Sequence, residues 1–332
     1  MYIVESYTLA VILTFVTMLC WGSWANTQKL AEKSWRFELF YWDYVIGIVV
    51  MSLLFAFTLG SFGESGRGFL ADLKQADPVN IQKALLGGII FNAANILVAA
   101  AIAIAGMSVA FPVGIGIALV LGVIINFVAT PQGNAVWLFV GVTLVALAIV
   151  LDALAYRKKA SQALKIPTKG IVLSLIGGVM MALFYRFVAS SMAGDFLHPQ
   201  AGLLTPYTAT VFFSIGVLIS NLIFNTLLMK KPFEGKPVGY AQYFKGGVKE
   251  HLTGILGGMI WCIGMSLSII AAGKAGFPVS YGLGQGATLI AALWGVFIWK
   301  EFKGSKGTSG LLAAMFLLFV AGIGLIIYAG SN

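Results

Sequence analysis

Long apolar runs separated by short polar segments set the pattern of this chain. Ten runs cover residues 7–29, 39–60, 82–105, 108–128, 134–156, 169–192, 205–228, 249–273, 276–299 and 308–328. Each is long enough for an α-helix to cross the hydrocarbon core of a bilayer, which is about 30 Å thick. Because backbone polar groups inside lipid must be satisfied within the segment, all the runs are predicted to be helices.

A pattern of small residues and proline occurs twice along these runs. The copies are Gly87-Gly88, Gly106 and Phe111-Pro112-Val113, and then Gly257-Gly258, Gly273 and Phe277-Pro278-Val279. Five predicted spans precede the middle of the chain and five follow it, so the second half enters the membrane from the opposite side. The predicted fold is an all-α membrane protein with ten transmembrane helices in two inverted five-helix repeats. The repeats are residues 1–156 and 169–332, joined by a cytoplasmic connector at residues 157–168.

Each copy of the repeated pattern predicts a tight helical hairpin. Spans three and four are separated by little more than Met107, and spans eight and nine by Lys274. Pro112 and Pro278 then fall near the first turn of the second helix, where the missing N–H does little harm.

Basic residues gather in alternate loops and predict the orientation. Sixteen follow spans one, five, seven and nine, whereas only Arg67, Lys74, Lys83 and Lys274 occupy the other loops. By the positive-inside rule, the lysine-rich loops face the cytoplasm, and both termini lie outside. The expected location is the cell inner membrane, as a multi-pass protein.

Composition supports the membrane assignment and excludes several functions. Hydrophobic residues make up 59% and charged residues 10% of the chain, whereas soluble domains carry about 25% charged residues. The net charge of +9 comes from the loops, so it does not indicate nucleic-acid binding. Cys20 and Cys262 lie in apolar runs, and His198 and His251 are expected in loops. No catalytic or metal-binding motif is present, so the chain is not expected to be an enzyme or to need a cofactor or metal.

Asn92 and Asn95 are polar residues deep in span three, three apart and therefore on one helix face. Either they hold helices together or they face a polar solute. Counted from the glycine pair, their counterparts in the second half are Cys262 and Met265. Because symmetric packing would require an amide in both halves, this mismatch favours substrate binding.

Gln285 in span nine shows the same broken symmetry, since its counterpart in the first half is Leu119. Glycines flank it, which permits close approach either of another helix or of a ligand. Tyr281 lies one turn earlier on the same face.

Tryptophans in two spans are further candidates for the substrate site. Trp21 and Trp24 lie about one turn inside the basic end of span one, and Trp261 follows the second glycine pair. Either they anchor the protein at the membrane interface or they line a cavity, where aromatic faces stack on sugars and flat heterocycles alike.

The charges within the spans are few. Arg186 is the deepest and is expected either to function in coupling or to pair with Asp43 or Asp152. Asp43 opens span two, where a carboxylate complements the helix dipole; the alternative is proton coupling. Asp152 ends span five beside the basic run at Arg157 and is expected to form a surface ion pair.

The arrangement of spans resembles the drug/metabolite transporter superfamily, and short motifs resemble its ureide permease family. These motifs are Met1-Tyr2-Ile3-Val4-Glu5-Ser6, Trp21-Gly22-Ser23-Trp24, Tyr41-Trp42-Asp43-Tyr44 and Leu204-Thr205-Pro206-Tyr207-Thr208-Ala209. The chain is more distantly similar to glucose/ribose porters. The resemblance implies uptake of ureides or nucleobases with protons. The connector between the two halves is shorter here than in plant ureide permeases.

The leading hypothesis is a secondary transporter of a small, polar, mostly uncharged solute such as a ureide, nucleobase or sugar. The expected partners are this solute, protons and the lipid bilayer, with the protein a monomer or homodimer. The substrate site is predicted at Trp21, Trp24, Asn92, Asn95, Trp261, Tyr281 and Gln285, with Asp43 and Arg186 as coupling residues. Alternatives are a drug or metabolite exporter of the same superfamily and a membrane receptor or scaffold.

Overall fold

The computed structural model describes residues 1–332 except 32–34, 106–109, 160–166, 234 and 332. The described part is almost entirely helical. Its α-helices are α1 (Tyr7–Ser23), α2 (Ala25–Ala31), α3 (Phe37–Phe57), α4 (Phe69–Gln75), α5 (Pro78–Ala105), α7 (Gly116–Ala129), α8 (Ala135–Lys159), α9 (Thr168–Ser191), α10 (Pro206–Lys230), α11 (Tyr240–Tyr243), α12 (Val248–Ala275), α13 (Phe277–Gly284), α14 (Ala287–Leu293) and α15 (Ser309–Ser331). Two π-helical turns, η1 (Phe111–Ile115) and η2 (Trp294–Ile298), complete the set.

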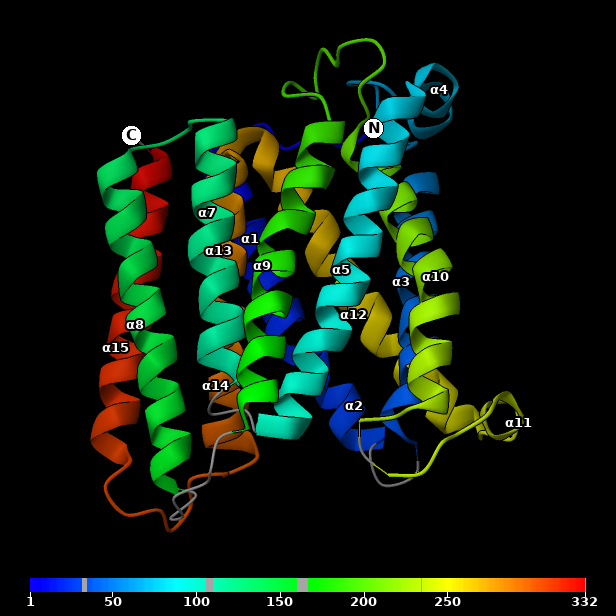
Figure 1. The fold of residues 1–332 in the computed structure, drawn as a ribbon. Coiled ribbons are helices and arrows are strands. Elements are labelled where there is room, and N and C mark those ends of the chain that lie inside the picture. Colours follow the sequence, from blue (N-terminus) through cyan, green and yellow to red (C-terminus); the bar gives the residue numbers. More distant parts are fainter. Residues whose placement is uncertain (32–34, 106–109, 160–166, 234, 332) are drawn as a thin grey trace.

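The long helices run side by side along a common direction, with both termini at one end of the bundle (Figure 1). We call the other end, which carries α2, α11 and the lysine-rich loops, the basic end. Within the described ranges, nine helices are long and apolar enough to cross a membrane, and Val113–Ala129 is a shorter apolar helix. The membrane-protein fold class is confirmed.

Span four differs in detail from its prediction. Its first residues and the hairpin at Met107 lie outside the described residues, and Pro112 belongs to a π-helical turn rather than to an α-helical one. The second hairpin has the predicted tight form. Lys274 lies in the last turn of α12, and Gly276, at a φ of +80°, reverses the chain before α13 begins. This φ lies in the left-handed region, where glycine carries no steric cost.

Two predicted spans are interrupted. Span one breaks at Trp24, between α1 and α2, where the Thr27 amide bonds to the Trp24 carbonyl three residues earlier. Span nine breaks at Gln285 and Gly286, between α13 and α14, and there too the backbone bonds reach back three residues instead of four. Tightened turns of this kind inside a helix often mark functional positions.

The glycine pairs let helices from opposite halves of the chain touch through their backbones. A Cβ on Gly88 would overlap the Phe213 carbonyl oxygen of α10, and a Cβ on Gly258 would overlap the Tyr44 carbonyl oxygen of α3. The two glycine pairs therefore have equivalent roles, because each lets the third span of its half pack closely against the second span of the other half.

The largest helix contacts all join one half to the other. The contact of α5 with α9 is matched by that of α12 with α1, and the contact of α5 with α10 by that of α12 with α3. In addition, α3 packs on α10 and α8 packs on α15, each span meeting its own counterpart. The halves are thus interleaved around one shared core and do not form separate bodies.

Candidate functional site

Stacked aromatic rings link the predicted tryptophans at the centre of the bundle. The rings of Trp21 and Trp261 are stacked, with centroids 5.9 Å apart, and Trp21 Nε1 donates to the Trp261 carbonyl oxygen at 3.2 Å. Trp261 is almost fully buried, because Phe91 and Phe213 also pack on it. Trp21 is only half-buried. Trp261 therefore supports the ring of Trp21, which keeps free surface.

Trp24 belongs to a second aromatic group, which reaches the amides of span three. Its ring lies 4.7 Å from Tyr44, and Tyr44 in turn lies 5.4 Å from Tyr41. The Tyr41 hydroxyl donates to Asn92 Oδ1 at 2.9 Å and accepts from Asn95 Nδ2 at 3.0 Å. One connected set of side chains thus brings span one to span three.

The two asparagines differ in availability. Asn92 is fully buried, and its Nδ2 also donates to Ser220 Oγ of α10 at 3.0 Å. Asn95 is half-buried and donates only to Tyr41 among the hydrogen bonds of the described chain. Asn92 therefore holds α5 against α3 and α10, whereas Asn95 keeps an acceptor oxygen and a second N–H for a solute.

Gln285 lies at the interruption of span nine. Its side chain is half-buried and has no hydrogen-bond partner within the described part of the chain. The preceding Gly284 lies against the Trp21 ring, so the interruption of span nine adjoins Trp21. Tyr281 is fully buried and donates to the Ala118 carbonyl oxygen of α7 at 2.9 Å. Gln285 is thus available to a ligand in this conformation, and Tyr281 packs α13 on α7.

Asp43 is not at a helix start, as the sequence suggested, but in the second turn of α3, where the helix dipole has little effect. It is 1% exposed and has three donors. Oδ1 lies 2.6 Å from the Tyr243 hydroxyl and 2.8 Å from His251 Nδ1, and Oδ2 accepts from Trp35 Nε1 at 2.9 Å. We call these four residues the Asp43 hub.

His251 is also placed differently from its prediction. It lies in the first turn of α12 rather than in a loop, because α12 begins at Val248. The Asp43 hub therefore joins α3 of the first half to α11 and α12 of the second. Burial, and then the hydrogen bond to Asp43, raise the pKa of the Tyr243 hydroxyl, so that Tyr243 stays a donor.

The predicted pairing of Arg186 with Asp43 or Asp152 is wrong. No ion pair or hydrogen bond of Arg186 occurs among the described residues. The faces of α9 that carry Phe184 and Tyr185 pack inward on aromatic rings, while Arg186 falls on the remaining face with the exposed Val179. A long arginine side chain near a span end can reach the membrane interface from such a face. Its role in coupling stays a prediction.

Sequence reasoning missed a ladder of three contacts between span one and the end of span nine. Trp294 Nε1 donates to Ser23 Oγ at 2.8 Å, Trp299 Nε1 donates to Asn26 Oδ1 at 2.6 Å, and Lys29 Nζ lies 2.7 Å from Glu301 Oε1. We call these six residues the basic-end ladder. The spacing of three between Ser23, Asn26 and Lys29, which puts polar groups on one helix face, was the available signal.

Asp152 departs from its prediction as well. It forms no surface ion pair within the described chain, and its Oδ1 is buried with no hydrogen-bond partner. Tyr156, one turn later on α8, donates to Glu301 Oε2 at 2.6 Å. Asp152 therefore lies near the last rung of the ladder with no hydrogen bond from the described residues to its buried Oδ1.

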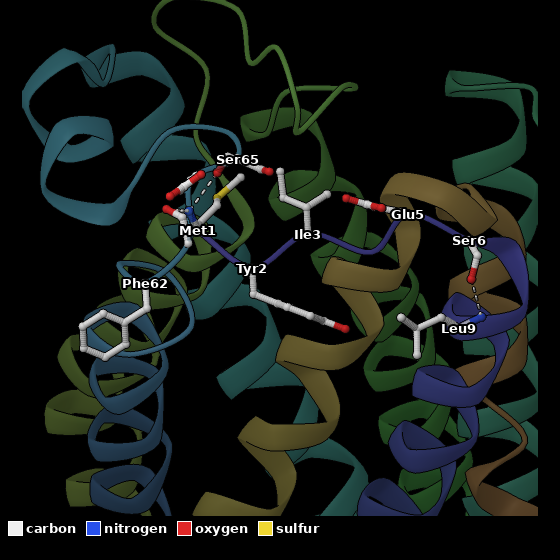
Figure 2. Close-up of a pocket in the computed structure, with 10 residues that line it drawn as sticks. Met1, Tyr2, Ile3, Glu5, Ser6, Leu9, Phe62 and Ser65 are labelled. Atoms are coloured by element: carbon white, nitrogen blue, oxygen red, sulfur yellow. Dashed lines mark hydrogen bonds between the residues drawn. The ribbon is translucent and has the colours of Figure 1, made fainter.

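Two pockets open at the end opposite the basic end, and neither includes a predicted site residue. The larger, of about 560 Å³, lies between the extended residues 1–6 and the loop around Phe62 and Ser65 (Figure 2). Glu5 is among the residues that line it. The smaller, of about 290 Å³, lies between Val4 and the segment 194–198. Both pockets thus lie at the end of the bundle that carries the termini.

The fold defines a multi-pass α-helical membrane protein. Comparison with protein families gives the particular kind: the ureide permease model matches residues 40–169 and 159–329. The chain belongs to the ureide permease family. It is accordingly a transporter and not an enzyme, and the comparisons do not favour the exporter alternative.

Curated relatives align along the whole chain. Ureide permease 1 of Arabidopsis thaliana is 22% identical over 389 residues, covering 100% of both chains, and Ureide permease 4 of the same plant is 23% identical with the same coverage. The probable ureide permease A3 of Vigna unguiculata is 23% identical, covering 92% of this chain and 98% of its own. A solved crystal structure matches with a TM-score of 0.62 at 16% identity over 96% of each chain, which shows a shared fold.

Proposed function

We propose that this protein is a secondary active transporter that takes up a ureide, or a related small uncharged solute, by proton-coupled alternating access. One observation carries the proposal. The half-buried Trp24 and Gln285 lie at the interruptions of spans one and nine, and α1 packs directly on both α13 and α14. Discontinuous helices near the bilayer midplane are a common way in which transporters bind substrates.

The chemistry of these side chains suits a ureide. A ureido group is flat and neutral, with N–H donors on either side of a carbonyl acceptor. Gln285 and Asn95 offer amide groups that can both donate and accept, and Trp21 and Trp24 offer flat faces. Trp261, Asn92 and Tyr281, which are buried, would hold these groups in place. The names of the relatives in the ureide permease family support the same substrate class.

The paired contacts of the two halves support alternating access. A two-fold pattern of helix contacts permits a second conformation, in which the two ends of the bundle exchange roles. In the proposed orientation the basic end faces the cytoplasm and both termini lie outside the inner membrane. The two pockets at the opposite end would then receive the solute from outside. Asp43 is the sequence-based candidate for proton coupling.

The test is uptake of radiolabelled allantoin into proteoliposomes, with and without an inward proton gradient, in competition with uracil and glucose. We expect accumulation that depends on the gradient, and stronger competition by unlabelled allantoin than by uracil or glucose. Uptake that ignores the gradient would contradict symport, and competition by glucose alone would contradict the ureide assignment.

The site itself is tested with Gln285→Leu, which inserts the residue found at the equivalent position of the first half. We expect this variant to lose uptake while its thermal unfolding stays unchanged, because Gln285 has no partner to lose. Gln82→Leu, which alters an exposed glutamine of α5, is the matched control and should transport normally. Normal uptake by Gln285→Leu would assign Gln285 to packing.

A further inference from the structure

The basic-end ladder ends in a carboxylate that is held in its charged form. Glu301 is contacted by Lys29 from α2 and Tyr156 from α8, at 2.7 and 2.6 Å. Burial acts to raise the pKa of the Glu301 carboxyl. The hydrogen bonds from Lys29 and Tyr156 and the charges of Lys29 and Lys159 outweigh it, so the pKa lies below its ordinary value. Glu301 is therefore a fixed negative charge at neutral pH.

Asp152 lies near this fixed charge, but among the described residues its buried oxygen has no hydrogen-bond donor such as those that contact Glu301. Its Oδ1 is buried and has no hydrogen-bond partner in the described chain, and the negative charge of Glu301 acts on it. The helices α7 and α15, which pack on α8, contribute no acidic or basic side chain there. Tyr156 and Lys159, the nearby titratable groups of α8 itself, are engaged with Glu301 or with aromatic rings.

A bare, buried carboxylate oxygen next to a second carboxylate is unfavourable when both are ionised. Neither charge is then fully solvated, and the two repel each other. A proton on the unpartnered oxygen removes the repulsion without disturbing Lys29, Tyr156 or Glu301. The arrangement therefore favours a neutral Asp152 beside an ionised Glu301.

We infer that Asp152 binds the transported proton and that its ionisation opens the basic-end ladder. This inference rests on the proposed function and deepens it. With Asp152 protonated, the Lys29–Glu301 rung stays closed and ties span one to span nine. When the O–H bond of Asp152 breaks and the proton passes to water at the basic end, the new charge repels Glu301. The rung is then weakened, and the ladder can part.

The position of the ladder explains how proton release reaches the solute. Its first rung, Ser23 to Trp294, adjoins the break at Trp24. The ladder residues of span nine come after the break at Gln285 and are joined to it by α14. Parting of the ladder would therefore free the basic-end parts of both interrupted spans. The solute and the proton would leave through the same opening.

The first experiment compares Asp152→Asn with wild type in allantoin-loaded and empty proteoliposomes. We expect the variant to lose gradient-driven accumulation and to keep allantoin counterflow near the wild-type rate, because the uncharged amide mimics the protonated acid. Asp152→Glu, which keeps a titratable group, should retain part of the accumulation. If Asp152→Asn accumulates allantoin as wild type does, the inference is overturned although the proposed function stands.

A second experiment does not depend on transport. It distinguishes failure of the Asp152 assignment from failure of the proposed function. Infrared difference spectra of the purified protein, recorded below and above neutral pH, should show a protonated-carboxyl C=O band in wild type and in Asp43→Asn. The band should be missing from Asp152→Asn. Its persistence in Asp152→Asn would refute the assignment even if allantoin is not the substrate. Loss of the band only in Asp43→Asn would move the proton to the Asp43 hub.

Discussion

Two aspartates near the basic end of the bundle have opposite surroundings. Asp43 receives three hydrogen bonds on its two oxygens, from Trp35, Tyr243 and His251, whereas Asp152 has a buried oxygen that receives none. Donors aimed at a carboxylate favour its charged form, and a neighbouring carboxylate disfavours it. Asp43 is thus surrounded by donors, whereas the buried oxygen of Asp152 has none within the described chain and lies near the charge of Glu301.

The difference also separates two tasks. The Asp43 hub joins three elements that are already packed closely, since Gly254 of α12 lies directly against the Asp43 side chain. The Asp152 cluster instead adjoins contacts that hold two interrupted spans. We therefore propose that the contacts of the Asp43 hub are kept in both conformations of the transport cycle, whereas the contacts of the ladder beside Asp152 break.

The largest effect is expected for Asp43→Asn. The amide cannot accept from all three donors, so we expect a loss of about 3 kcal/mol in unfolding free energy, as when one partner of a buried charged pair is removed. Chemical denaturation in detergent micelles measures it. Asp195→Asn is the control, because its Asp–His pair is exposed and should contribute little. Equal stability of the two variants would contradict the role of the Asp43 hub.

Tyr243→Phe should have a smaller effect in the same direction. It removes one donor and leaves His251 and Trp35 in place, so a loss of about 2 kcal/mol is expected for a hydrogen bond to a charged group. Tyr240→Phe, which removes an exposed hydroxyl contact with Thr226, should change the same denaturation midpoint little. A larger loss for Tyr240→Phe would mean that α11 as a whole, and not the hub, holds these elements together.

Asn221 offers an unpartnered buried group that cannot titrate. Counted by the spacing between Gly47 and Gly216, its counterpart is Ser52, which bonds to Ser214, whereas neither polar atom of the Asn221 side chain has a hydrogen-bond partner within the described chain. Asn221→Val should therefore raise the unfolding free energy by about 1 kcal/mol at every pH. Asp152→Asn should leave it unchanged in acid and raise it increasingly as pH climbs above about 4, where an unfolded aspartate loses its proton. Identical pH profiles for the two variants would remove the distinction.

The smallest effect concerns acid. Because the folded pKa of Glu301 is lowered, its interaction with Lys29 contributes stability above the pKa of an unfolded glutamate and loses it as pH falls through the folded value. Both side chains are partly exposed, at 40% for Lys29 and 24% for Glu301, so about 0.5 kcal/mol is expected. Wild type and Glu301→Gln should differ at neutral pH and converge in acid.

The spans were predictable because lipid imposes length and apolarity on each run separately. The interruptions were not, since the run of Trp24 has no proline, Pro278 lies in the first turn of α13 well before Gln285, and only Gly284 and Gly286 hint at a break. Partners were harder still. Tyr243 and His251 lie 200 and 208 residues from Asp43, and no pattern within α3 indicates them. Broken symmetry drew attention to Gln285 and Asn95, whose substrate role stays a prediction, and it did not distinguish Asn92, which is engaged in packing.

The interleaving of the two halves has a consequence for biosynthesis. When the ribosome has completed α8, every large contact face of the five spans already made, including the groove at Gly88, still lacks its helix. The early spans must therefore wait in the bilayer, loosely associated, until α9, α10 and α12 are inserted between them. A chain cut at the connector would leave two fragments that can pack only against each other. Each fragment alone would expose unpaired helix faces and be a substrate for membrane quality control.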